Sequence, residues 1–174
     1  VYERLRKFFF SCKWFEAYDF IEFVPQGHPD GKRAEQFRST TNALLQQEVS
    51  AYRFVDQRIA RIVSPEEINA VEEAVKIEVG PVREHLDQAL KLLADRRSPD
   101  YRNSIKESIS AVEALVRSVT GLDKGTLGDL LKRLRRDTTI HPALEGAFSK
   151  LYGYTSDADG IRHALLDEDR VTFE

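Results

Sequence analysis

The clearest helix signal in the chain is residues 98–121, SPDYRNSIKESISAVEALVRSVTG, and it decides the fold class. Ser98, Pro99 and Asp100 supply a cap and a first-turn proline, and Gly121 supplies a stop. A narrow apolar stripe at helical spacing lies between these signals, and small residues border it, so a second helix can approach closely. The stripe is Ile105, Ile109, Val112, Val116 and Val119, and its small neighbours are Ser104, Ser108 and Ala111.

Similar helical spacing extends outward from this stretch in both directions, and one segment departs from it. Residues 1–24, 31–50, 64–79 and 82–93 each indicate helix, as do segments beginning near Leu127, Pro142 and Asp157. Residues 51–63 instead hold β-branched and aromatic runs around Asp56-Gln57-Arg58, which predict a short β-hairpin. We therefore predict a mostly α fold, a helical bundle with a small β-hairpin inserted near residues 51–63.

The length of 174 residues and the 41% hydrophobic content indicate one globular domain, and the 32% charged residues, above the usual quarter, suit a helical, well-solvated surface. We expect residues 1–50 to form N-terminal helices and residues 64–174 to form the bundle. Cys12 is the single cysteine, so an internal disulfide is impossible, and no apolar run is long enough for a membrane span. These features favour a cytoplasmic protein without a membrane partner. The start at Val1 and the absence of Met indicate a fragment or a processed form.

Metal binding is not supported by the spacing of the histidines. His28, His85, His141 and His163 form no H-x3-H or H-E-x-x-H pair, and there is no cysteine pair to complete a zinc site. Cys12 lies in an aromatic segment, which favours an inert, buried thiol. We predict no metal and no other cofactor.

A basic cluster between residues 124 and 136 is a candidate for phosphate binding. Five basic residues stand there against one acidic residue, a net charge of +4, in a chain whose net charge is −3. Such a patch would bind RNA with strong salt dependence. A solvated helix face and pairing with the acidic residues 157–174 are the alternatives. The candidate RNA-binding residues are Lys132, Arg133, Arg135 and Arg136.

Arg162 and His163 are adjacent at the start of the last predicted helix. Successive helical residues lie about 100° apart, so both cannot face the same core contact. A guanidinium beside an imidazole suits an anionic phosphate, because the first neutralises charge and the second moves a proton near neutral pH. The alternative is a capping pair of Arg162 with Asp157 or Asp159.

Five segments of the chain resemble the abortive-infection AbiJ N-terminal-domain type. They are PDYRNSIKESISAVE at 99–113, IHPAL at 140–144, LYGYTSDADGIRHAL at 151–165, SAYRFV at 50–55 and REHL at 83–86. The resemblance spans nearly the whole chain. It implies a branch of the HEPN superfamily, helical domains that dimerise and often act as metal-independent ribonucleases in bacterial toxin and antiphage systems.

The superfamily motif is Arg, a polar residue, three further positions and His, near the start of the last core helix. By position Arg162 matches the arginine and His163 the polar residue, whereas Asp167 stands where the motif has its histidine. We take these three as the candidate catalytic residues. Two other segments have similar spacing: 136–141 lies beside Pro142, outside a helix, and 102–107 ends in glutamate.

The resemblance implies an antiphage or toxin-type protein, with Arg162 steadying a phosphate and His163 moving protons if RNA is cleaved. The alternative is a non-catalytic dimerisation, nucleotide-binding or RNA-binding module, which the missing histidine favours. A homodimer is expected in either case. The resemblance also implies a further helix after Phe173 that this sequence lacks.

Overall fold

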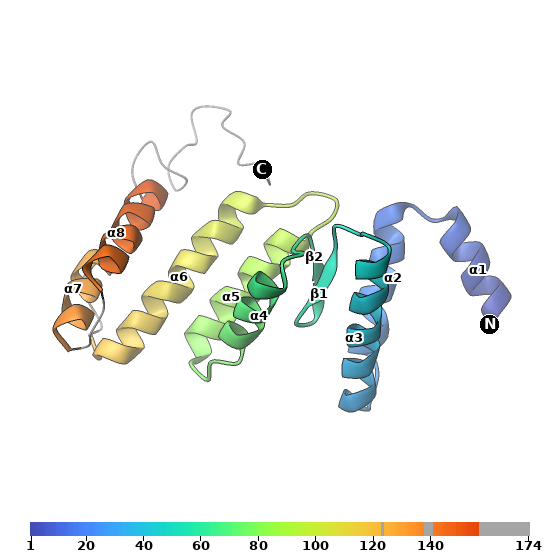
Figure 1. Ribbon diagram of the computed structural model, residues 1–174, viewed down its shortest axis with the longest axis horizontal. Helices are drawn as coiled ribbons and strands as arrows, with labels where there is room; N and C mark the ends of the chain where they lie inside the picture. The colour runs from blue at the N-terminus through green and yellow to red at the C-terminus, as the bar shows by residue number, and fades with distance from the viewer. Residues whose placement is uncertain (123, 138–140, 157–174) are drawn as a thin grey trace. The chain divides into compact units, whose positions relative to one another are not determined.

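The computed structural model describes residues 1–122, 124–137 and 141–156. Within these ranges the regular secondary structure is helical apart from one two-stranded antiparallel hairpin, so the predicted mostly α fold is confirmed (Figure 1). The elements are α1 (Tyr2–Ser11), α2 (Trp14–Gln26), α3 (Gly31–Gln47), β1 (Arg53–Val55), β2 (Arg58–Ala60), α4 (Pro65–Val75), α5 (Gly80–Ala94), α6 (Tyr101–Thr120), α7 (Leu127–Asp137) and α8 (Pro142–Ser156). The helix predicted to begin near Asp157 lies outside the described residues.

The chain divides into two compact units. The N-terminal unit combines Val1–Glu72 with Ala94–Pro99, and the helical unit combines Glu73–Leu93 with the residues from Asp100 onward. The sequence predicted a single domain with an inserted hairpin. The division into two compact units does not test that prediction, which stays a prediction. The short segment 94–99 is part of the N-terminal unit although it follows 21 residues of the helical unit, Glu73–Leu93.

The predicted helix over residues 1–24 is wrong in one respect, because it is two helices. Cys12 is extended, with φ −76° and ψ 161°, and Lys13 is the N-cap of α2. The Lys13 backbone N–H donates to Glu16 Oε2 at 2.7 Å, which satisfies a donor at the new helix start. The aromatic spacing continues across this break, so periodicity alone did not reveal it.

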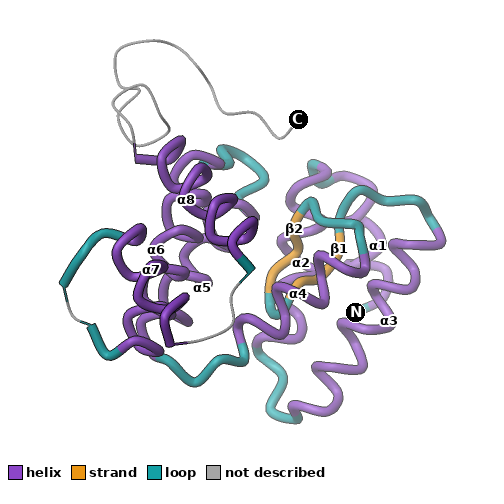
Figure 2. Tube along the Cα trace, turned by 60° about the vertical axis from the view of Figure 1, so that its left-hand side comes forward, coloured by secondary structure: helices purple, strands orange, loops and turns teal. Residues whose placement is uncertain are grey.

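The hairpin lies at the centre of the N-terminal unit's core. Its strands, orange in Figure 2, pair Phe54 with Ile59, and both residues are almost fully buried. Asp56 makes the turn with a left-handed φ of 52°, a conformation that aspartate tolerates better than most residues. Helix α3 contacts β1, and α2 contacts β2. Each strand of the hairpin is therefore contacted by a different helix.

Side chains from these helices bond the outward-facing backbone of the hairpin. Asn42 of α3 accepts from the Phe54 N–H at 2.6 Å and donates to the Phe54 carbonyl at 3.0 Å. On the other edge, Glu22 of α2 accepts from the Ile59 N–H at 2.7 Å. Phe54 and Ile59 thus form a non-hydrogen-bonded pair whose polar groups point away from each other. A two-stranded ribbon is marginal by itself, and these contacts supply the missing ladder partners.

In the helical unit, a hydrogen bond between two small residues joins α5 and α6. Ala89 and Ala111 are buried, and the buried Ser104 donates from Oγ to the Ala89 carbonyl at 2.9 Å. Asp100 caps α6, and Gly121 ends it with φ 66°. The stop at Gly121 is confirmed. The start differs in detail, because Asp100 is the cap and Pro99 therefore precedes the helix and is not in its first turn.

Helices α6, α7 and α8 share one apolar cluster. Val116 of α6 packs against three buried leucines of α7, with Phe148 and Tyr152 of α8 partly buried against them. The leucines are Leu127, Leu130 and Leu131. Among the described residues, no helix has the length and apolar character needed to cross a membrane.

Candidate functional site

Helix α7, which carries the candidate RNA-binding residues, begins with a reciprocal cap. Asp129 N–H donates to Thr126 Oγ1 at 3.3 Å, and both the Thr126 hydroxyl (2.7 Å) and its backbone N–H (3.2 Å) donate to Asp129 Oδ2. The two bonds that Asp129 Oδ2 accepts lower the pKa of the Asp129 carboxyl, and the bond from the Thr126 hydroxyl contributes most. The helix start is therefore fixed by local residues.

Helix α7 separates apolar from basic residues. Leu127, Leu130 and Leu131 are buried, and Leu134 packs against the same cluster. The four candidate basic residues are exposed. The structure therefore brings Lys132, Arg133, Arg135 and Arg136 together on the part of α7 that the core leaves uncovered.

Arg135, one of these cations, forms an ion pair within the unit. Arg135 Nη1 lies 2.9 Å from Glu145 Oε2 of α8, and the Glu145 side chain is only 16% exposed. This ion pair neutralises part of the local charge and fastens α7 to α8. A phosphate reaching α7 would meet Arg135 already bonded to a carboxylate.

The predicted catalytic residues Arg162, His163 and Asp167 lie outside the described residues. The alternative segment 136–141 does not lie on one helix, because Arg136 is in α7 and His141 precedes α8. His141 Nδ1 accepts the Ala143 backbone N–H at 3.2 Å, a local role at the start of α8.

Sequence reasoning missed a pairing of titratable side chains between α5 and α6. His85 Nδ1 lies 2.7 Å from Glu107 Oε2, with side chains 39% and 26% exposed. A carboxylate on one ring nitrogen orients the imidazole and leaves Nε2 as the nitrogen that Glu107 does not engage. Such a pair can transfer protons to a bound group. Both residues lie in segments that were noted in the sequence: His85 in REHL at 83–86, and Glu107 at the end of the motif-like segment 102–107.

The remaining histidine and the cysteine in the described part have local roles. His28 Nδ1 accepts the Asp30 N–H at 3.1 Å, next to the N-cap of α3. The half-buried Cys12 thiol is directed to the Phe9 carbonyl at 3.7 Å. Within residues 1–122, 124–137 and 141–156, no three His, Cys, Asp or Glu side chains gather as a metal-binding group.

Comparison with protein families gives a match for the N-terminal part of the chain. Residues 1–76 match the family described as AbiJ N-terminal domain 4. No curated protein and no solved structure matches the chain. The AbiJ-type resemblance is thus confirmed, over residues 1–76, and most of the segments that suggested it lie C-terminal to the match. The match ends four residues after the first stretch of the N-terminal unit, Val1–Glu72.

Proposed function

Because residues 1–76 match AbiJ N-terminal domain 4, we propose that this protein acts in abortive infection, as an antiphage defence protein that engages RNA through its helical unit. The family match is the observation that carries the defence role. The cytoplasm is the expected location for such a protein, since its RNA targets are there.

The exposed basic side of α7 supports RNA engagement. Lys132, Arg133 and Arg136 are exposed cations on a helix whose other side is held in the core. Lysine and arginine side chains bind phosphates without reading sequence, and they displace counterions when they do so. Binding through α7 would therefore weaken as salt rises.

The proposed reaction is metal-independent endonucleolytic cleavage of RNA. In this reaction Arg162 neutralises the charge that develops on the phosphate, and His163 donates or accepts the proton. Asp167 occupies the motif position of the second histidine. Two subunits are expected to assemble the site, so activity should fall on dilution.

A non-catalytic module that dimerises or binds RNA or a nucleotide is the second candidate. The observation that favours it is aspartate at position 167, because an ionised carboxylate cannot donate a proton as a histidine can. This module would retain RNA or nucleotide affinity and show no turnover.

The two candidates are separated by incubating the purified chain with a total-RNA pool in excess EDTA. Cleavage that persists in EDTA and is lost in His163→Ala and Arg162→Ala, with circular dichroism unchanged, supports the nuclease. Binding without cleavage supports the second candidate. Cleavage abolished by EDTA contradicts the metal-independent mechanism.

The role of α7 is tested by the salt dependence of RNA affinity. Lys132→Gln/Arg136→Gln removes two α7 cations, and the matched control Lys91→Gln/Lys106→Gln removes two exposed cations from α5 and α6. For single-stranded RNA each lost phosphate contact lowers the slope of log K against log salt by about 0.7, so the α7 variant should lose roughly 1.4. Equal slopes in the two variants would place RNA elsewhere.

A further inference from the structure

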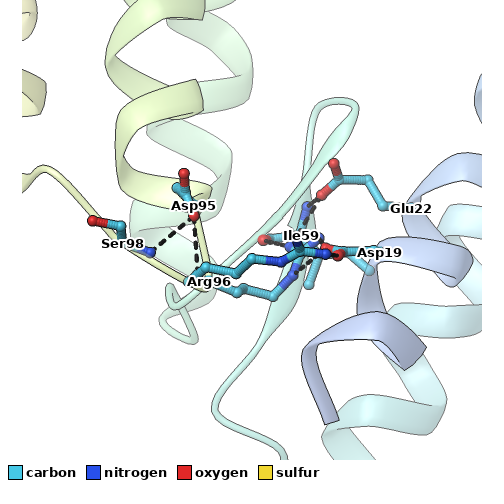
Figure 3. Close-up of polar contacts among 7 residues, drawn as sticks. Asp19, Glu22, Ile59, Asp95, Arg96 and Ser98 are labelled. Atoms are coloured by element: carbon cyan, nitrogen blue, oxygen red, sulfur yellow. Dashed lines mark hydrogen bonds and ion pairs between the residues drawn. The ribbon is translucent and has the colours of Figure 1, made fainter. Parts of the chain in front are cut away.

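The backbone of Ile59 in β2 is bonded by two side chains of opposite charge. Its N–H donates to Glu22 Oε2 at 2.7 Å, and its carbonyl accepts from Arg96 Nη1 at 2.7 Å (Figure 3). A neighbouring strand would offer one acceptor and one donor at these places. The carboxylate and the guanidinium together replace that strand.

Arg96 is held on several sides. Its Nη2 and Nε donate to Asp19 Oδ1 at 2.6 and 3.1 Å, and its Nη1 also donates to Glu22 Oε2 at 3.2 Å. The Arg96 side chain is only 5% exposed, and that of Glu22 17%. A buried guanidinium is tolerated when carboxylates compensate its charge and its donors are bonded, and both conditions hold here.

The planar geometry of the guanidinium explains why arginine suits this position. The four bonds use all three nitrogens and reach two carboxylates and a carbonyl in different directions. Lysine carries a single ammonium nitrogen and could not reach these acceptors together. The arrangement is selective for a guanidinium group.

The local conformation of segment 94–99 presents Arg96 to this site. Asp95 Oδ1 accepts from the backbone N–H groups of Ser98 at 3.0 Å and Arg97 at 2.9 Å, which folds the segment into a turn (Figure 3). The Arg97 guanidinium lies 4.8 Å from the centre of the Phe15 ring. The segment is therefore fixed on α2 by two arginines, of which Arg96 is the buried one.

Segment 94–99 lies beyond the family match at residues 1–76 but belongs to the N-terminal unit. We propose that Asp19, Glu22 and the Ile59 carbonyl form a guanidinium-binding site, and that its ligand is Arg96 of this chain. The segment 94–99 then completes the AbiJ-type N-terminal unit and acts as a latch. It begins at Ala94, the last residue of α5, and precedes α6, so release of Arg96 frees the chain between these two helices.

The latch is tested on the full chain by hydrogen exchange with mass spectrometry. Arg96→Ala leaves the buried carboxylate of Glu22 uncompensated, and exchange of the 53–60 and 94–100 amides should accelerate by roughly a hundredfold or more. The matched control is Arg33→Ala, because Arg33 is an arginine of α3 that pairs with Asp30 and whose side chain is 75% exposed. Its effect should stay below about tenfold. Equal effects of the two variants would overturn the proposal.

Chemical rescue tests the ligand class. Ethylguanidinium added to Arg96→Ala should restore slow exchange at residues 53–60, whereas ethylammonium at the same ionic strength should not. Failure of rescue, or equal rescue by both cations, would contradict a guanidinium site.

A second variant keeps the proposal testable if Arg96→Ala does not fold. Glu22→Gln retains an oxygen acceptor for the Ile59 N–H and removes one of the two charges that compensate Arg96. It should accelerate exchange at residues 94–100 more than Glu48→Gln, which alters an exposed carboxylate at the end of α3. An equal response would refute the charge coupling.

Discussion

Asn42 offers the sharpest test of how the hairpin is held. Its side-chain amide bonds both polar groups of Phe54, a residue that is only 1% exposed. Asn42→Ala removes both bonds and leaves a backbone N–H and a backbone carbonyl without their partner. The substitution does not disturb the helix, because alanine has the better helix propensity.

The expected loss follows from the cost of unsatisfied backbone groups. Each buried donor or acceptor left without a partner costs about 1–3 kcal/mol, and alanine in a helix returns about 0.6 kcal/mol relative to asparagine. Two such groups cost about 2–6 kcal/mol together, so we expect a net loss of about 1.4–5.4 kcal/mol. With a urea m value of about 2 kcal/mol/M, the urea concentration at the unfolding midpoint should fall by roughly 0.7–2.7 M.

The assay is urea unfolding followed by tryptophan fluorescence. Trp14 is the only tryptophan in the sequence, and its ring lies 5.8 Å from that of Tyr52, next to β1, so the signal reports on the N-terminal unit. Gln46→Ala, at an exposed position one turn further along α3, is the control. A midpoint shift no larger than that of the control would show that water replaces Asn42, and the reasoning would be refuted.

Two further predictions concern the helical unit. Leu130→Ala should lower the free energy of unfolding by about 2–5 kcal/mol, because Leu130 is fully buried in the apolar cluster around α7. Leu144→Ala, at a residue that is 51% exposed, should lower it by well under half of that. Both losses are measured by urea unfolding followed by circular dichroism. Comparable losses would contradict the placement of α7. Hydrogen bonds from Asn103 lower the pKa of the Asp100 carboxyl, and the bond from the Asn103 backbone N–H contributes most. The Asp100 carboxylate therefore stabilises α6 at pH values above the pKa that Asp100 has in the unfolded chain. This stabilisation is lost as pH falls through the lower pKa of the folded protein. Asp100→Asn keeps a cap that does not titrate, so the wild type should lose stability relative to this variant below about pH 4, and parallel pH curves would refute this assignment.

Local signals in the sequence predicted much of the secondary structure. Gly121 ends α6 as expected, and the predicted start signal is correct to within two residues, since a cap and a left-handed stop act within one helical turn. The hairpin was recognised from its change of period. The basic residues of α7 were also predicted, because helical spacing separates them from the leucines.

Contacts between distant residues could not be predicted in this way. The break at Cys12 and Lys13 interrupts an aromatic pattern that continues on both sides of it. His85 and Glu107 meet because α5 and α6 pack at a particular register, which spacing within either helix does not specify. The sequence pattern predicted the hairpin that contains Phe54 and Ile59. It did not predict that Asn42 and Glu22 bond the backbone of these two residues.

The sequence by itself determined where helices start and stop and which residues of each helix are apolar, because those properties depend on neighbours within a few positions. Only the tertiary structure decided that Arg96, 77 residues from Asp19, returns to the N-terminal unit and completes the edge of β2. The physical reason is that a buried charge is stable only where the folded chain supplies its counter-charges, and no local pattern encodes which carboxylates those are.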